Sequence, residues 1–288
     1  MALRFVPSKT PVDADTSDCI VVGAFTGGHF SPSGAAVDSA SAGRLSSLAE
    51  RGDISGKIGQ TVLLQDVPGL ASPRVLVVGL GDAAKFAVPQ YLKAVADAVR
   101  FLRSGPVKSA TITLTDLPVQ GRDADWAVRQ AVIAADHAAY EYTATRSKKA
   151  GVTLTEVNLT LDDAQHEAFR HGEAIAAGVQ FTRELGNLPP NICNPAYLAD
   201  QAIALAAEND NVTCEVLERE EMQALGMGSL LAVARGSANA PKLIVLRYPG
   251  DGDAKPLALV GKGITFDTGG VSLKPGAGQV SARSTAIG

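Results

Sequence analysis

Three charged side chains, Lys262, Asp267 and Lys274, lie close together in a glycine-rich segment near the end of the sequence. An apolar run, residues 256–260, comes just before them and predicts a strand that delivers these groups to a loop. A lysine can bind a metal ion only after it loses its proton, and burial or a nearby cation favours that loss. The spacing therefore suits one neutral amine and one carboxylate that share an ion or an ion pair.

The same residues also have a purely structural interpretation. Lys262 could extend along the surface toward solvent, and Asp267 could cap a turn. The glycines at positions 261, 263, 269 and 270 could serve tight bends, or they could let the backbone approach a ligand closely. Spacing alone leaves both interpretations open, because charged residues in glycine-rich loops are common.

A longer match favours the chemical interpretation. Residues 259–275 read Leu-Val-Gly-Lys-Gly-Ile-Thr-Phe-Asp-Thr-Gly-Gly-Val-Ser-Leu-Lys-Pro, and this segment resembles the metal-binding signature of the leucyl aminopeptidases, also called cytosol aminopeptidases. The resemblance extends over nearly the whole chain up to Gly278. It includes residues 126–131, 178–185, 187–191 and 194–199.

The resemblance implies a role for each of the three charged residues. Lys262 would bind one metal ion, Asp267 would bridge two ions, usually Mn²⁺ or Zn²⁺, and Lys274 would polarise the scissile carbonyl. Two such ions bind a peptide's amino terminus and carbonyl while they activate a bridging water. The implied reaction is removal of N-terminal amino acids, preferably leucine, from peptides with a free N-terminus. The family also implies a cytoplasmic homo-hexamer.

After Gly278 the sequence departs from the family pattern. Thr285 stands where the family places a further metal-binding aspartate, and a neutral hydroxyl cannot replace that charge. A later Asp-x-Glu-Gly-Arg segment of the family is absent. We therefore expect a C-terminally truncated representative with a divergent tail, an incomplete metal site and little activity by itself.

Composition bears on a rival function, that of a non-catalytic DNA-binding or assembly protein derived from the same family. The net charge is −4, with 26 basic and 30 acidic residues, so bulk charge does not indicate nucleic-acid binding. No apolar run is long enough to predict a membrane span. Three scattered cysteines do not form a disulfide framework, which favours a reducing, cytoplasmic location.

Alternating short apolar runs and helical patterns predict an α/β fold. We expect an N-terminal mixed-sheet α/β domain over residues 1–160, a linking helix over 161–187, and an incomplete catalytic metallopeptidase domain over 188–288. The last would be the start of an α/β/α zinc-exopeptidase-like domain. In the first domain, the predicted strands cover 19–25, 61–64, 74–79, 110–114 and 152–159, and the predicted helices cover 36–51, 89–103 and 125–142.

The remaining elements follow a long helix that we predict over residues 163–186. Three prolines between residues 189 and 195 end that helix, and a new one is expected over 195–208. Residues 212–217, 220–225, 230–234, 243–248 and 258–260 are predicted to form the opening strands of the second domain and one short helix.

A second glycine motif has a competing interpretation. Residues 79–84 fit the dinucleotide-binding pattern G-x-G-x-x-A after a predicted strand. No acidic residue ends a following strand at the required distance, because a helix is predicted there. We therefore interpret the motif as a tight turn after a buried strand.

Overall fold

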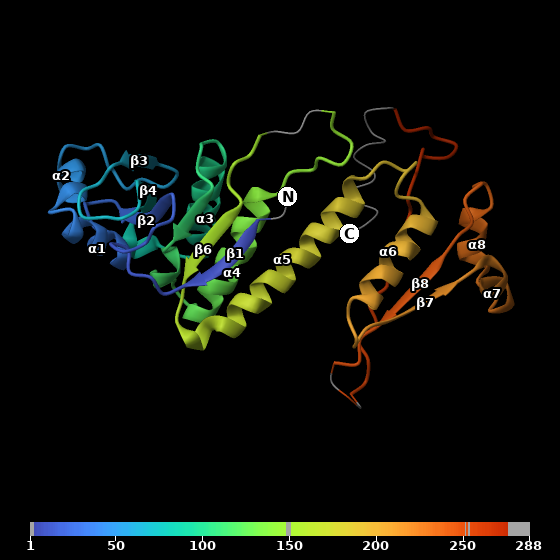
Figure 1. The fold of residues 1–288 in the computed structure, drawn as a ribbon. Coiled ribbons are helices and arrows are strands. Elements are labelled where there is room, and N and C mark those ends of the chain that lie inside the picture. Colours follow the sequence, from blue (N-terminus) through green and yellow to red (C-terminus); the bar gives the residue numbers. More distant parts are fainter. Residues whose placement is uncertain (1–2, 148–150, 251, 253, 276–288) are drawn as a thin grey trace. The chain divides into compact units, whose positions relative to one another are not determined.

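The computed structural model describes residues 3–147, 151–250, 252 and 254–275 (Figure 1). The chain divides into two compact units, Met1–Gln180 and Phe181–Gly288. None of the helices within the described residues combines the length and the hydropathy that a membrane crossing requires.

A six-stranded sheet forms the centre of the first unit within the described residues, in the order β1-β6-β5-β2-β4-β3. Neighbouring strands are parallel except for β3, which is antiparallel to β4. Strands β2 and β4 are mostly buried and rich in valine, as expected for parallel strands that are covered on both faces. The strands are β1 (Arg4–Ser8), β2 (Cys19–Phe25), β3 (Thr61–Gln65), β4 (Arg74–Gly81), β5 (Ser109–Ile112) and β6 (Glu156–Thr160).

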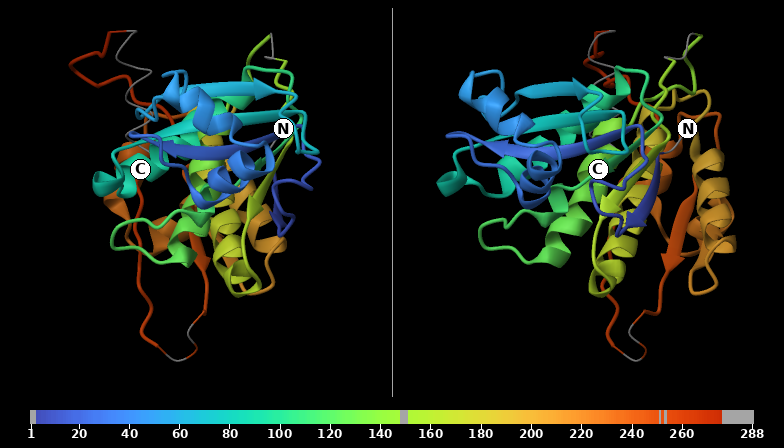
Figure 2. Two further views of the ribbon diagram at one scale, coloured as in Figure 1. Left: turned by 90° about the vertical axis from the view of Figure 1, so that its left-hand side faces the viewer. Right: turned by 60° about the vertical axis from the view of Figure 1, so that its left-hand side comes forward.

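Helices cover both faces of this sheet (Figures 1 and 2). The buried apolar side chains form two hydrophobic clusters, and successive residues of β2 belong to them alternately. Ile20 and Val22 belong to the first cluster, and Cys19 and Val21 belong to the second. The first cluster includes buried residues of α1 and α2, and the second includes those of α3, α4 and α5. These helices are α1 (Pro32–Ala40), α2 (Arg44–Glu50), α3 (Val88–Arg103), α4 (Ala124–Ala139) and α5 (His166–Asn187), with short 3₁₀ turns at Ala83–Lys85, Leu114–Asp116 and Asp163–Gln165.

Polar side chains define where several helices begin. The Ser31 hydroxyl accepts a hydrogen bond from the Gly34 amide at the start of α1. At the start of α4 the Asp123 carboxylate accepts one from the Trp126 amide, at 2.7 Å. Each bond pairs an amide that the first helical turn leaves without a partner.

The second unit contains α6 (Pro195–Ala207), β7 (Thr213–Leu217), α7 (Arg219–Ala224), α8 (Gly228–Ala234) and β8 (Leu243–Arg247). Strands β7 and β8 pair as an antiparallel two-stranded sheet within the described residues, and α6 contacts both strands. Several large apolar side chains of this unit are exposed, including Val233, Leu257 and Leu259.

Three predictions for individual elements need correction, and one strand lacks a prediction. The single helix expected over 36–51 is two helices, because the chain turns at Gly43, which has a φ of 81°. Residues 230–234 lie in α8, so the described part of the unit has two short helices, α7 and α8, rather than one. Residues 256–260, expected as a strand, have no regular secondary structure. Strand β1 was not predicted.

The glycine motif at residues 79–84 lies where the tight-turn interpretation places it. Gly79 is within β4, and Gly81 ends the strand with a φ of 81°. A Cβ atom at Gly79 would lie 1.9 Å from the carbonyl oxygen of Lys57, so this glycine allows two backbone segments to approach closely.

Candidate metal-binding site

The segment that carries the three charged residues is shaped by short-range hydrogen bonds rather than by a helix or strand. The Asp267 carboxylate accepts one bond from the Gly269 amide, at 2.8 Å, and another from the Lys274 ammonium, at 2.6 Å. The Lys274 amide donates to the carbonyl of Thr268, also at 2.8 Å. These bonds fold residues 267–274 into a closed loop.

Two glycines allow this loop to turn. Gly269 and Gly270 have φ values of 108° and 112°, which other residues adopt only with strain. A Cβ atom at Gly269 would also lie 2.2 Å from the carbonyl oxygen of Ser272. A Cβ atom at Gly261, Gly263 or Gly270 would meet no neighbouring atom within 4 Å. Of the four glycines in this segment, Gly269 is therefore the one that lies close to another part of the backbone.

The electrostatic surroundings keep Asp267 ionised. The hydrogen bond from Lys274 is the largest cause that holds the pKa of this carboxyl below its ordinary value of 3.8. The Gly269 amide acts in the same direction, and the charge of Lys262 adds a smaller effect. Asp267 is therefore an anion at neutral pH, with 42% of its side chain exposed.

The structure joins two of the three predicted site residues directly. Asp267 and Lys274 form an ion pair, whereas Lys262 is exposed at the start of the segment and makes no hydrogen bond or ion pair with Asp267. Asp267 also caps the turn at Gly269, as the structural interpretation of the sequence expected. No group of three or more His, Cys, Asp or Glu side chains suited to a metal ion occurs within the described residues. Gly278 and Thr285 lie outside those residues.

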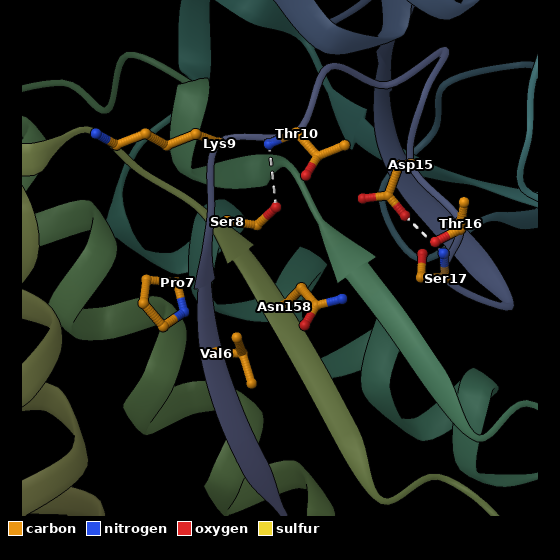
Figure 3. A pocket seen from close by; sticks show the side chains of 9 residues that line it. All are labelled: Val6, Pro7, Ser8, Lys9, Thr10, Asp15, Thr16, Ser17 and Asn158. Atoms are coloured by element: carbon orange, nitrogen blue, oxygen red, sulfur yellow. Dashed lines mark hydrogen bonds between the residues drawn. The ribbon is translucent and has the colours of Figure 1, made fainter.

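A polar pocket of about 300 Å³ lies in the first unit, and sequence analysis did not single it out (Figure 3). Its buried carboxylate, Asp15, accepts hydrogen bonds from the Ser17 amide at 2.8 Å and from the Thr111 hydroxyl at 2.7 Å. Because each Asp15 oxygen already has a protein donor, we assign this carboxylate the structural role of attaching the segment before β2 to the sheet. The pattern Asp-x-Ser, typical of turns, is the signal that could have indicated it. The pocket is lined by Val6, Pro7, Ser8, Lys9, Thr10, Asp15, Thr16, Ser17 and Asn158.

Sequence profiles of one family match both parts of the chain. The profile described as "Cytosol aminopeptidase family, N-terminal domain" matches residues 21–149. The profile described as "Cytosol aminopeptidase family, catalytic domain" matches residues 180–288, a range that includes the residues after Gly278. The chain belongs to the cytosol aminopeptidase family.

Individual members of this family are similar along most of the chain. A protein named "Probable cytosol aminopeptidase" from Stenotrophomonas maltophilia is 59% identical over 276 residues, which are 95% of this chain and 56% of the relative. A protein of the same name from Xylella fastidiosa is 53% identical over the same shares. The chain thus spans about half the length of the curated relatives it matches.

Solved structures agree with the α/β fold predicted from the sequence. A tomato leucine aminopeptidase variant has a TM-score of 0.75 and 28% identity, over 92% of this chain and 55% of that chain. The bottromycin maturation enzyme BotP in complex with Mn has a TM-score of 0.71 and 28% identity, over 94% of this chain and 55% of that chain.

The donors in the loop fit a divalent cation in type. Asp267 offers an ionised, partly exposed carboxylate, and oxygen ligands of this kind suit Mn²⁺ and Zn²⁺. Lys262 offers an exposed amine, which would need to lose its proton to act as a ligand. Two donors do not complete the coordination of two ions, so other positions would be taken by water, substrate or residues outside the described ranges.

Proposed function

We propose that this chain forms part of a metal-dependent aminopeptidase that removes N-terminal amino acids, preferably leucine, from peptides. The observation that carries the proposal is the match of both family domains to one chain that also bears the Lys262–Lys274 loop. The Mn-bound structure of BotP supports a divalent metal cofactor, and we propose two ions, either Mn²⁺ or Zn²⁺.

Each charged residue of the loop has a defined task in this proposal. Asp267 would hold the ions through its carboxylate oxygens, and Lys262 would hold one of them through its neutral amine. Lys274 would donate a hydrogen bond from its ammonium group to the carbonyl oxygen of the scissile peptide bond, where negative charge develops. When bound, the ions would lower the pKa of a water molecule toward neutrality and so supply a hydroxide nucleophile.

The proposed substrate is a peptide with a free amino terminus, and the proposed location is the cytoplasm. The names of the relatives support that location, and so does the sequence, whose three scattered cysteines do not predict a disulfide framework. Assembly into a homo-hexamer remains a prediction from the family resemblance.

The test measures the release of leucine from a leucyl peptide, with and without added Mn²⁺. We expect weak Mn²⁺-dependent release from this chain by itself, because its described donors do not complete the coordination of two ions. That release should fall below detection in Asp267→Asn and decrease by about 100-fold or more in Lys274→Met, because one aimed donor is lost. Lys255→Gln, which removes a charge from the exposed start of the same segment, should retain the rate. Release that does not depend on Mn²⁺ or survives in Asp267→Asn would disprove the proposal.

A further inference from the structure

The Asp267 carboxylate is fully engaged by the loop itself. One oxygen accepts the bond from the Gly269 amide and the other accepts the bond from the Lys274 ammonium. The two positive-φ glycines and the bond from the Lys274 amide to Thr268 return the chain to Asp267. A cation that binds this carboxylate must therefore share it with, or take it from, a group that the same loop supplies.

The two protein donors differ in how easily they can be displaced. The Gly269 amide lies two residues from Asp267 in a turn that a side chain at Gly269 would not allow. The amide is fixed by the backbone of this turn, so its bond to Asp267 breaks only if the turn changes. The Lys274 ammonium is at the end of a flexible side chain, and 33% of that side chain is exposed. A partly exposed ion pair of this kind is weak, because water solvates both charges well.

We propose that Lys274 is an internal counter-ion for Asp267, and that a divalent cation displaces its ammonium group when the cation binds the carboxylate. This inference rests on the proposed function, since it takes Asp267 as a metal ligand. Without the cation, the ion pair neutralises Asp267 and holds the loop closed. With the cation, the carboxylate oxygen exchanges one positive partner for another.

The exchange would link metal loading to catalytic readiness. Lys274 cannot direct its ammonium group at a substrate carbonyl while that group is bound to Asp267. Once the cation takes its place, the ammonium no longer binds Asp267 and can turn toward a substrate carbonyl close to the ion-binding carboxylate. The residue that contacts the substrate is therefore released by the event that completes the site.

The first experiment measures the reactivity of individual lysines toward an acetylating reagent by mass spectrometry, with and without Mn²⁺. In the metal-free protein we expect Lys274 to react more slowly than exposed Lys255, and Asp267→Asn should remove that difference. Saturating Mn²⁺ should raise the reactivity of Lys274 and leave Lys255 unchanged. Bound Mn²⁺ is counted separately by electron paramagnetic resonance.

The second experiment compares Mn²⁺ affinities. Lys274→Gln removes the competing ammonium, so we expect it to bind Mn²⁺ about two- to fivefold more tightly than the wild type, the range that an exposed ion pair supports. Lys255→Gln removes an equal charge without touching Asp267 and should bind as the wild type does.

The outcomes separate this inference from the proposed function. If Mn²⁺ binds while Lys274 stays unreactive, or if Lys274→Gln binds no more tightly, the counter-ion proposal is wrong and the metal site stands. If the protein binds no Mn²⁺, both proposals are wrong. Release of Lys274 together with tighter binding in Lys274→Gln supports both.

Discussion

Asp116 follows β5 and binds the start of α1 through one oxygen only. That oxygen accepts a hydrogen bond from the Ser33 amide, at 2.7 Å. The other oxygen is buried and has no hydrogen-bond partner among the described residues. Burial raises the pKa of this carboxyl above its ordinary value of 3.8, although the bonds from Ser33 oppose the shift.

This raised pKa predicts how Asp116 affects stability as the pH changes. The folded protein binds the Asp116 proton more tightly than the unfolded chain does. Protonation of Asp116 therefore adds to the free energy of unfolding below the ordinary pKa, and this contribution is lost as the pH rises through the raised pKa. The free energy of unfolding of the wild type, minus that of Asp116→Asn, should therefore decrease from about pH 3 toward neutral pH. Denaturant titrations at several pH values measure it, and a difference that grows with pH would contradict the assignment.

At the residue scale, the sequence predicts which side chains would carry the chemistry but not how they pair. Asp267 and Lys274 were assigned separate tasks, and their ion pair depends on the φ values of Gly269 and Gly270, which residue type permits but does not dictate. Asp15 was missed because its partner Thr111 lies far away along the chain, and local spacing does not reveal such a contact.

At the element scale, long or strongly patterned segments were predictable and short ones were not. The apolar strand over residues 19–25 and the amphipathic helix over 89–103 agree with the observed β2 and α3 to within one residue. Residues 230–234 and 256–260 are short apolar runs, and a run of this length does not distinguish a strand from a helix or from an unpaired segment. A strand also needs a partner, which spacing within one run cannot show.

The close approach at Gly79 gives a prediction for β4. Gly79→Ala would place a methyl group 1.9 Å from the Lys57 carbonyl oxygen, so the backbone must shift and we expect a loss of about 1–3 kcal/mol or more in the free energy of unfolding. Gly178→Ala, in α5, is the control: apart from the neighbouring backbone of α5 itself, no atom lies within 4 Å of the added group, and alanine favours the helix by about 0.5–1 kcal/mol. Thermal and denaturant unfolding measure both variants. Equal stabilities would contradict the packing argument.

At the scale of the whole molecule, the two units differ in how completely they bury their apolar side chains. In the first unit both faces of the six-stranded sheet are covered, and the core reaches Phe169 and Ala176 of α5. In the second unit large apolar side chains such as Val233, Leu246 and Leu259 stay exposed. Sequence patterns predicted two α/β parts, but burial depends on contacts that only the folded chain defines.

This contrast predicts the behaviour of fragments. A fragment of residues 1–180 should unfold cooperatively and bind less hydrophobic dye than the 288-residue chain. A fragment of residues 1–160 should be less stable, because it lacks Phe169, and loss of one buried aromatic side chain costs about 3–5 kcal/mol. Denaturation curves and dye fluorescence test both statements. Equal stabilities of the two fragments would show that α5 adds nothing to the core.

The separation of β7 from β8 by α7 and α8 also affects synthesis on the ribosome. Strand β7 ends at Leu217, and β8 begins at Leu243. Translation adds about 5–20 residues per second, so β7 waits roughly one to five seconds for the strand it pairs with. During that interval the edge of β7 that later binds β8 is unpaired and can pair with other extended segments. The yield of folded protein should therefore depend on how fast residues 218–242 are translated.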